Sequence, residues 1–350
     1  MRQFIDAIWL VRESAMIRLT LLAIPLTLMG VGPAAASPHY AATASIAVPD
    51  GGWDLVAVDP ASRQLFVART DSVTAVDLTH GRSVRSFGKL DRGHQAIPIP
   101  GTHQVLATSG KDNTAYLLDA SDGREIARVP VGANPDAAIF DAISRRAFVM
   151  NAKDGTVSVL DPVRARVEAT IPMKPGLELA AITKGRALFI NNEEASEIES
   201  IDLRTLKSRA TIALPGCEGP TGLAYDAKSD RLISACANGK AAIVDVRTGR
   251  EMALLPIGKG PDGAMIDEAR RMAFIPCGRD GILEVIALDG PGGPKVVDRI
   301  KTEVGARTGA IDPTDGAIYL PTARFDPPAT PGARPTPIPG TAHLIVVAPQ

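Results

Sequence analysis

Apolar and β-branched residues recur along this chain in short runs that are separated by turn-forming residues. The segment 132–173 shows the pattern most clearly: the runs AAIF, AFVMN, TVSVLD and RVEATIPM alternate with turns that contain Asp, Gly and Arg. Runs of this length that are rich in β-branched residues and bounded by turn formers predict β-strands. The segment therefore predicts four consecutive strands within 42 residues.

The same four-strand unit repeats from Trp53 to the C-terminus. The first-strand markers, which end the first strand of each unit, recur every 41 to 45 residues at Asp59, Pro100, Asp141, Thr183, Asp226, Asp267 and Asp312. A second set ends the third strands of the first five units and recurs every 41 to 43 residues, at Asp77, Asp119, Asp161, Asp202 and Asp245. Four strands in about 40–45 residues are typical of a β-propeller blade. The sequence thus predicts an all-β fold, a seven-bladed β-propeller of four-stranded blades.

The seventh unit is one strand short, because it ends at its third strand, HLIVVAPQ. The segment 40–48 precedes the first unit and alternates as a strand does. We expect this N-terminal strand to complete the last blade, which closes the ring and leaves no exposed seam.

Residues 1–36 differ in kind from the repeats. Arg18 is followed by the apolar run LTLLAIPLTLMGVG and then by Ala34-Ala35-Ala36, the layout of a secretory signal peptide with its cleavage site. The alternatives are an uncleaved anchor helix, for which the run is short, and translation from Met16. We predict a signal peptide over 1–36, a propeller over 37–350, and a periplasmic or secreted protein without a transmembrane anchor after cleavage.

Composition limits the partners. The whole chain has 38 basic and 39 acidic residues, a net charge of −1. Removing 1–36 takes away three Arg and two acids, which leaves 35 basic and 37 acidic residues. A nearly neutral surface gives no electrostatic reason to expect nucleic acid as a partner. We expect a monomer that binds an unknown small molecule or protein.

Three cysteines, Cys217, Cys236 and Cys277, remain in the predicted exported chain. One disulfide and one free thiol is the simplest partition in an oxidising compartment. Cys236 and Cys277 occupy equivalent places on adjacent blades, too far apart for a bridge. Cys217 lies in the loop that enters the fifth blade and Cys236 ends the neighbouring strand, so Cys217–Cys236 is the preferred pair.

The loops on one face of the predicted propeller carry the positions that vary. Five residues before each first-strand marker, where the innermost strands begin, stand Asp54, Gln95, Asp136, Glu178, Thr221, Asp262 and Arg307. His94 adjoins this ring, Asn151 lies in the next ring outward, and Arg69, Arg324 and Arg334 lie on the same loop face. We interpret Asp54, His94, Gln95, Asp136, Asn151, Glu178, Asp262 and Arg307 as a cation or polar-ligand site at the channel mouth. The alternative is a set of polar residues that are simply solvated there.

Catalysis has weaker support in the sequence. It has no G-x-S-x-G motif, and its few histidines are scattered, so we assign no catalytic residues and predict a binding protein rather than an enzyme. The alternative is a divalent-metal-dependent, lactonase-like hydrolase with Asp136, Asn151, Glu178 and Asp262 as ligands of Ca²⁺ or a similar cation. Cys236, Cys277 and His94 lack the spacing of a soft-metal site. We predict no other cofactor, since haem attachment by C-x-x-C-H is absent.

One loop departs from the regular pattern. The segment RFDPPATPGARPTPIPG, residues 324–340, contains six Pro between the second and third strands of the seventh blade. Such segments favour extended polyproline geometry. It is either a semi-rigid lid or docking strap, or a tolerated surface insertion.

The third unit, GANPDAAIFDAISRRAFVMNAKDGTVSVLDPVRARVEATIPM, resembles the YVTN-repeat β-propellers. AFVMN stands where that family has its name-giving motif, and TVSVLD matches the strand after it. The segments 220–258 and 261–281 are similar to the YncE-like exported branch, and the resemblance covers 40–350. It implies a propeller fold and an extracytoplasmic binding or surface-associated scaffold. The second and fourth units depart from the family pattern, because IPIPGTHQ and ITKGRAL lack its P-D-G turn.

Overall fold

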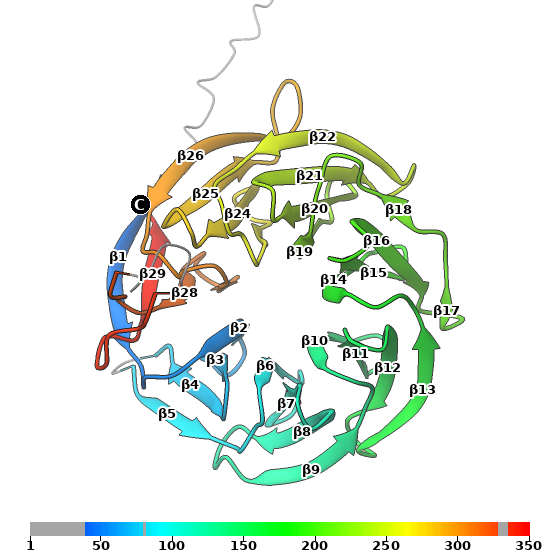
Figure 1. The fold of residues 1–350 in the computed structure, drawn as a ribbon, viewed down its shortest axis with the longest axis vertical. Helices are drawn as coiled ribbons and strands as arrows, with labels where there is room; N and C mark the ends of the chain where they lie inside the picture. Colours follow the sequence, from blue (N-terminus) through cyan, green and yellow to red (C-terminus); the bar gives the residue numbers. More distant parts are fainter. Residues whose placement is uncertain (1–38, 80–81, 328–334) are drawn as a thin grey trace, which may run out of the picture. The chain divides into compact units, whose positions relative to one another are not determined.

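The computed structural model of the chain describes residues 39–79, 82–327 and 335–350. Its strands form seven antiparallel sheets, which stand around a central channel (Figure 1). The predicted seven-bladed β-propeller is therefore confirmed. The predicted signal peptide over 1–36 lies outside the described residues. Within the described residues, no helix has the length and apolar character needed to cross a membrane.

Each blade contributes one strand to each of four concentric layers. The innermost strands are β2 (Trp53–Asp59), β6 (Gly93–Pro98), β10 (Pro135–Asp141), β14 (Leu177–Ile182), β19 (Pro220–Asp226), β23 (Met265–Asp267) and β27 (Ala310–Ile311). The second strands are β3 (Gln64–Arg69), β7 (Gln104–Ser109), β11 (Arg146–Asn151), β15 (Ala187–Asn192), β20 (Arg231–Cys236), β24 (Met272–Cys277) and β28 (Ile318–Thr322). The third strands are β4 (Val73–Asp77), β8 (Thr114–Asp119), β12 (Thr156–Asp161), β16 (Glu197–Asp202), β21 (Lys240–Asp245), β25 (Ile282–Ala287) and β29 (His343–Pro349).

The outermost layer contains two departures from a uniform repeat. Its strands are β5 (Val84–Phe87), β9 (Glu125–Pro130), β13 (Arg166–Pro172), β17 (Lys207–Ser208) with β18 (Ile212–Ala213), β22 (Arg250–Pro256), β26 (Lys295–Lys301) and β1 (Tyr40–Ala47). In the fourth blade the outer strand is divided, and both pieces pair with β16. In the seventh blade the outer strand comes from the opposite end of the chain.

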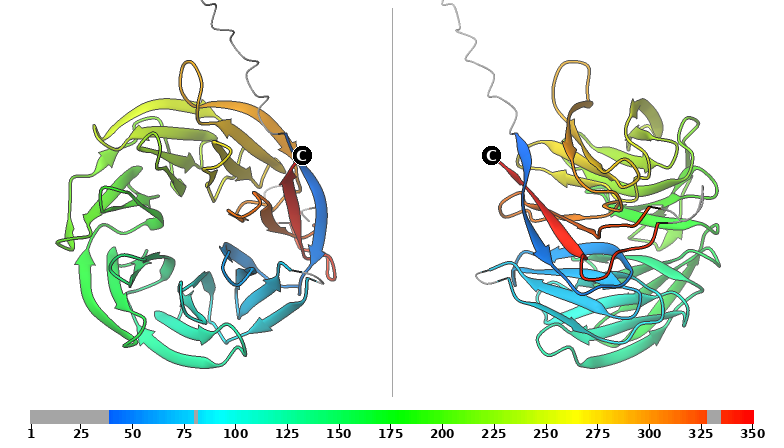
Figure 2. Two further views of the ribbon diagram at one scale, coloured as in Figure 1. Left: turned by 180° about the vertical axis from the view of Figure 1, so that it is seen from behind. Right: turned by 60° about the vertical axis from the view of Figure 1, so that its left-hand side comes forward.

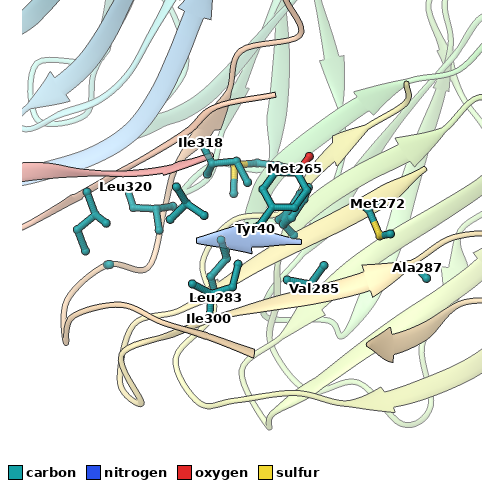
Figure 3. Packing of buried hydrophobic residues seen from close by; sticks show 13 residues of the cluster. Tyr40, Met265, Met272, Leu283, Val285, Ala287, Ile300, Ile318 and Leu320 are labelled. Atoms are coloured by element: carbon teal, nitrogen blue, oxygen red, sulfur yellow. The ribbon is translucent and has the colours of Figure 1, made fainter. Parts of the chain in front are cut away.

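The N-terminal strand closes the ring as the sequence predicts. β1 pairs antiparallel with β29, from Tyr40 opposite Pro349 to Ala47 opposite His343, and the two strands lie side by side in Figure 2. The Tyr40 ring lies in the buried cluster between the sixth and seventh blades (Figure 3), with its centroid 4.7 Å from that of Phe274. Its hydroxyl donates to Asp267 Oδ2 at 2.8 Å. The closing strand is thus fixed to both the last blade and its neighbour.

The hydrophobic core is divided among the junctions between blades. Seven buried clusters each join two neighbouring blades, as Phe148 of the third blade and Ile190 of the fourth do. Because each blade buries both of its faces on its neighbours, the described residues form one continuous unit rather than two domains.

Three of the first-strand markers hold neighbouring blades together by ion pairs. The Arg271 guanidinium donates two hydrogen bonds to the Asp226 carboxylate, each 2.7 Å long. Asp141 accepts from Arg186 of the next blade in the same way, and Arg63 of the first blade pairs with Asp312 of the seventh. The Asp226 side chain is 2% exposed, so the pair is well shielded from water. These acids fix the angle between blades at the end of the channel opposite the predicted mouth.

The predicted disulfide is present. Cys217 and Cys236 are bonded, with Cα atoms 5.3 Å apart, and Cys277 is a buried free thiol. The bridge ties the loop before β19 to the end of β20, so it constrains the fifth blade where the chain enters it.

Candidate functional site

The channel mouth is built by the starts of the innermost strands. Asp54 lies on β2, His94 on β6, Asp136 on β10 and Glu178 on β14, each one residue after its strand begins. Asp262 and Arg307 lie in the loops that precede the inner strands of the sixth and seventh blades. Because equivalent positions of a propeller lie at equal depth in the channel, these six side chains converge from six different blades.

A shared backbone irregularity explains how the strand residues reach the channel. The pairing of β2 with β3 slips between Trp53 and Val56, and β6 slips against β7 between Gly93 and Ala96. The same shift occurs at the starts of β10, β14 and β19. β-Bulges of this kind release side chains from strict alternation and are frequent next to functional sites. Periodicity along the sequence gives no sign of them.

The six side chains enclose one polar cavity. Together with Leu55 and Leu179 they line a space of about 160 Å³. The lining contains four carboxyl groups and one guanidinium, so a negative potential is expected there. The structure thus brings Asp54, His94, Asp136, Glu178, Asp262 and Arg307 together, and their role in binding a ligand stays a prediction.

His94 connects two of the acids. Its Nδ1 lies 2.8 Å from Asp54 Oδ2 and 3.2 Å from Asp136 Oδ1. The residue is only 7% exposed, and its Nε2 has no hydrogen-bond partner among the described residues. Burial lowers the pKa of the imidazole, but the hydrogen bond to Asp54 and the charge of Asp136 outweigh it, so the pKa of His94 is raised.

Arg307 neutralises the opposite side of the cavity. Its Nε donates to Asp262 Oδ2 at 2.6 Å, and its Nη2 lies 3.5 Å from Asp54 Oδ1. No described residue supplies a similar partner for the Glu178 carboxyl group.

Burial and mutual repulsion disfavour ionisation of the remaining acids. Burial, followed by the charges of Asp136 and Asp262, raises the pKa of Glu178 to about 10. Burial also raises the pKa of Asp136 to about 6, although the nearby His94 opposes the shift. The pKa of Asp262 is raised by burial in spite of Arg307. At neutral pH the mouth therefore stores protons that an incoming cation can displace.

Several predicted site residues lie elsewhere. The Gln95 side chain accepts a hydrogen bond from the Ala138 backbone. Asn151 is fully buried inside the third blade, where its Nδ2 donates to two hydroxyl groups of β12. The Arg69 guanidinium donates to the carbonyl oxygens of residues 49 and 51 and is buried, so it is not open on the loop face. Arg324 is exposed, and Arg334 lies outside the described residues.

The donor atoms that suit a metal ion differ from the set expected from the sequence. Among the described residues, Asp54, His94 and Asp136 offer one nitrogen and two oxygens within 4.8 Å of one another. This donor set fits a divalent transition ion such as Zn²⁺ or Mn²⁺ better than an all-oxygen Ca²⁺ site. Asn151 is separate from it, since its amide is committed inside the blade, and Cys236 cannot act as a thiolate ligand because it is in the disulfide.

The comparisons with known proteins support the architecture. No protein-family model matches the chain, and no curated protein matches it. Matching solved structures are numerous, with 1717 chains, so the fold alone does not select a function. One of them, described as Kuenenia stuttgartiensis hydrazine synthase, is 15% identical with a TM-score of 0.70, over 79% of this chain and 94% of that chain. At this identity the likeness shows a β-propeller fold, and the resemblance to YVTN-repeat proteins stays a prediction.

Proposed function

We propose that this chain is a non-catalytic, exported β-propeller that binds the positively charged part of a ligand at its channel mouth. The observation that supports it is the convergence of four carboxyl groups on one small cavity. Asp262 and Asp54 face the Arg307 guanidinium and Asp136 faces the His94 imidazole, so among the described residues Glu178 has no cationic partner, and a cation bound beside Asp136 and Glu178 would supply one.

The raised pKa values of Asp136 and Glu178 favour a binding role over a structural one. Carboxyl groups that are crowded together in this way destabilise the folded chain when they ionise. Residues whose arrangement costs stability without a compensating contact are typical of functional sites. A bound cation would compensate the repulsion.

Export belongs to the same proposal. A buried disulfide is favoured in an oxidising compartment, and the sequence predicts a signal peptide that ends at Ala36. Mass spectrometry of the protein from the extracytoplasmic fraction should find Ser37 at its N-terminus. A mature chain that retains Met1 or Met16 would contradict export by this signal.

The binding proposal is tested by calorimetric titration of residues 37–350 with 1,4-diaminobutane and with Ca²⁺, Mn²⁺ and Zn²⁺. We expect at least one of these cations to bind, and the double variant Asp136→Asn, Glu178→Gln to lose that binding while melting at the same temperature or higher. Glu218→Gln removes an exposed carboxyl group outside the cavity and serves as the matched control. The proposal is wrong if none of the cations binds the unchanged protein.

A second candidate is a divalent-metal-dependent, lactonase-like hydrolase. The close approach of Asp54, His94 and Asp136 favours it, because three protein ligands leave room for a further ligand on the side of the cavity. A metal held there would polarise a carbonyl oxygen of the substrate. Metal analysis of the purified protein separates the two candidates: less than stoichiometric metal, together with no rise in melting temperature on adding Zn²⁺ or Mn²⁺, excludes the hydrolase.

A further inference from the structure

A larger pocket opens beside the channel mouth. It has a volume of about 690 Å³ and shares Asp136 and Glu178 with the channel cavity, so the two spaces have a common wall. Its lining comes from the loop ends of the second, third and fourth blades, whose inner strands β6, β10 and β14 are neighbours in Figure 1. This volume lies within the range of about 300–1,000 Å³ that is usual for small-molecule sites.

The charges that line this pocket are unevenly distributed over its three blades. Its basic residues, Arg92, Lys111 and Lys153, come from the second and third blades. Its acidic residues, Asp136, Glu178, Glu193 and Glu194, come from the start of the third blade and from the fourth. One side of the pocket is therefore positive and the side toward the channel and the fourth blade is negative.

Two of the basic groups have no partner of their own. The Arg92 guanidinium and the Lys153 ammonium make no hydrogen bond or ion pair with any residue that the structure describes, although the charge of Arg92 acts on Asp136 and His94 at longer range. Lys111 Nζ, in contrast, lies 3.4 Å from Asp91 Oδ2. Arg92 has a positive φ of 65°, and its backbone N–H donates to the Thr70 carbonyl, which fixes where its side chain starts. Cationic groups that have no hydrogen-bonded partner can bind an anionic group of a ligand.

Gly110, which lines the pocket, packs against an unpartnered nitrogen of His94, a residue of the channel cavity. His94 Nε2 lacks a partner among the described residues, and a Cβ built at Gly110 would lie 2.8 Å from it and 2.8 Å from Asn134 Oδ1. Gly110 and Asn134 both line the pocket. Glycine at this position therefore lets His94 and Asn134 pack closely against the backbone, because no larger side chain fits there.

We infer that this pocket binds a zwitterionic ligand of the size of a short peptide. The ammonium group of the ligand lies against Asp136 and Glu178, and its carboxylate lies against Arg92 and Lys153. A peptide of three residues is at most about 10 Å long, which suits a pocket that carries opposite charges on its two sides. The inference rests on the proposed function, because the cationic end of the ligand occupies the channel mouth.

The test compares four probes by calorimetric titration of residues 37–350: triglycine, N-acetyl-triglycine, triglycine amide and glycine. Triglycine carries both charges, and each blocked form has lost one of them. We expect triglycine to bind at least tenfold more tightly than either blocked form. Glycine that binds as tightly as triglycine would contradict a ligand of peptide size.

Variants assign the carboxylate end to particular residues. Arg92→Gln with Lys153→Gln should reduce triglycine binding to the level of triglycine amide. Lys111→Gln is the matched control, since its ammonium already has Asp91 as a partner, and it should change the affinity less than threefold. Arg92 and Lys153 are both exposed, so the double variant should melt at the same temperature as the unchanged protein, which shows that it folds.

The failure of this inference differs from the failure of the proposed function. If triglycine amide binds as tightly as triglycine, or if none of the four probes binds, the zwitterionic ligand is excluded while cation binding at the mouth can stand. Asp262→Asn changes a residue that lines the channel cavity but not the larger pocket. If no cation binds and Asp262→Asn leaves triglycine binding unchanged, the proposed function fails instead.

Discussion

Cation binding at the channel mouth should release protons, and their number follows from the structure. A carboxyl group with a pKa of about 10, as for Glu178, carries a proton in nearly all molecules at pH 7. With a pKa of about 6, Asp136 is protonated in about one-tenth of molecules at pH 7 and in about half at pH 6. A cation that ionises both groups therefore releases about one proton at pH 7 and about 1.5 at pH 6.

The groups that face Glu178 set the direction of this effect. Asp136, Asp262, Glu193 and Asp54 all raise its pKa by repulsion, and burial adds to them. Because a cation favours the ionised form, affinity should rise with pH, by about tenfold, or 1.4 kcal/mol, per pH unit for each proton released. The affinity gain continues through pH 8, since the pKa of Glu178 lies above that range.

Titration in buffers that differ in their enthalpy of ionisation measures this number directly. The observed enthalpy should vary linearly with the buffer enthalpy, with a slope near one proton at pH 7. Glu178→Gln should reduce that slope to near zero. It should also raise the melting temperature at pH 8, because the folded chain no longer keeps a carboxyl group protonated that the unfolded chain ionises. Glu194→Gln, which changes an exposed carboxyl group of the larger pocket, is the control. Tight cation binding with no proton release from pH 6 to pH 8 would refute the reasoning.

Three further predictions concern stability and are checked by urea unfolding. Tyr40→Phe removes the buried hydrogen bond to Asp267 and should lower the unfolding free energy by about 1.5–3 kcal/mol; an unchanged value would mean that the closing strand is held by apolar contacts alone. Arg271→Gln leaves the buried Asp226 without its partner and should cost about 3–5 kcal/mol. The hydrogen bonds from Arg271 lower the pKa of the Asp226 carboxyl group in spite of its burial. The stabilisation is therefore fully present above about pH 4 and is lost as the pH falls through the lowered pKa of Asp226. Acid unfolding of Asp226→Asn that is identical to that of the unchanged protein would contradict this. Reduction of the disulfide, which closes a loop with a sequence separation of 19, should cost about 3 kcal/mol, and no change in midpoint would show that the bridge is dispensable.

The order of the strands could be predicted because each blade repeats the same local pattern. A run of apolar residues bounded by turns predicts a strand wherever it lies in the chain. Aligning the seven units then shows which strand of the blade each run forms. The missing strand of the last unit then required β1 beside β29, and the loop position of Cys217 indicated its bridge to Cys236. These inferences depend on chain order and on the place of each segment in the repeat, and not on the direction of any side chain.

Side-chain direction at the channel mouth could not be predicted in the same way. Asn151 has the spacing of a ring residue, but it ends a second strand and faces into its own blade, where β12 binds its amide. The sequence predicts His94 as a site residue from its place beside the ring, but not that it lies between Asp54 and Asp136, where the bulge at the start of β6 directs it. A bulge changes which face a side chain occupies, and it leaves no periodic signal.

The sequence by itself determined the blade count, the closing strand, the disulfide and the depth at which the polar ring lies. The tertiary structure alone decided which ring members share a cavity, because their contacts join blades that are about 40 residues or more apart in the chain. It also decided the role of the aspartates that first marked the repeat, which form ion pairs between blades. Contacts across a closed ring depend on the angle between blades, and that angle is set by packing at every junction rather than by any one segment.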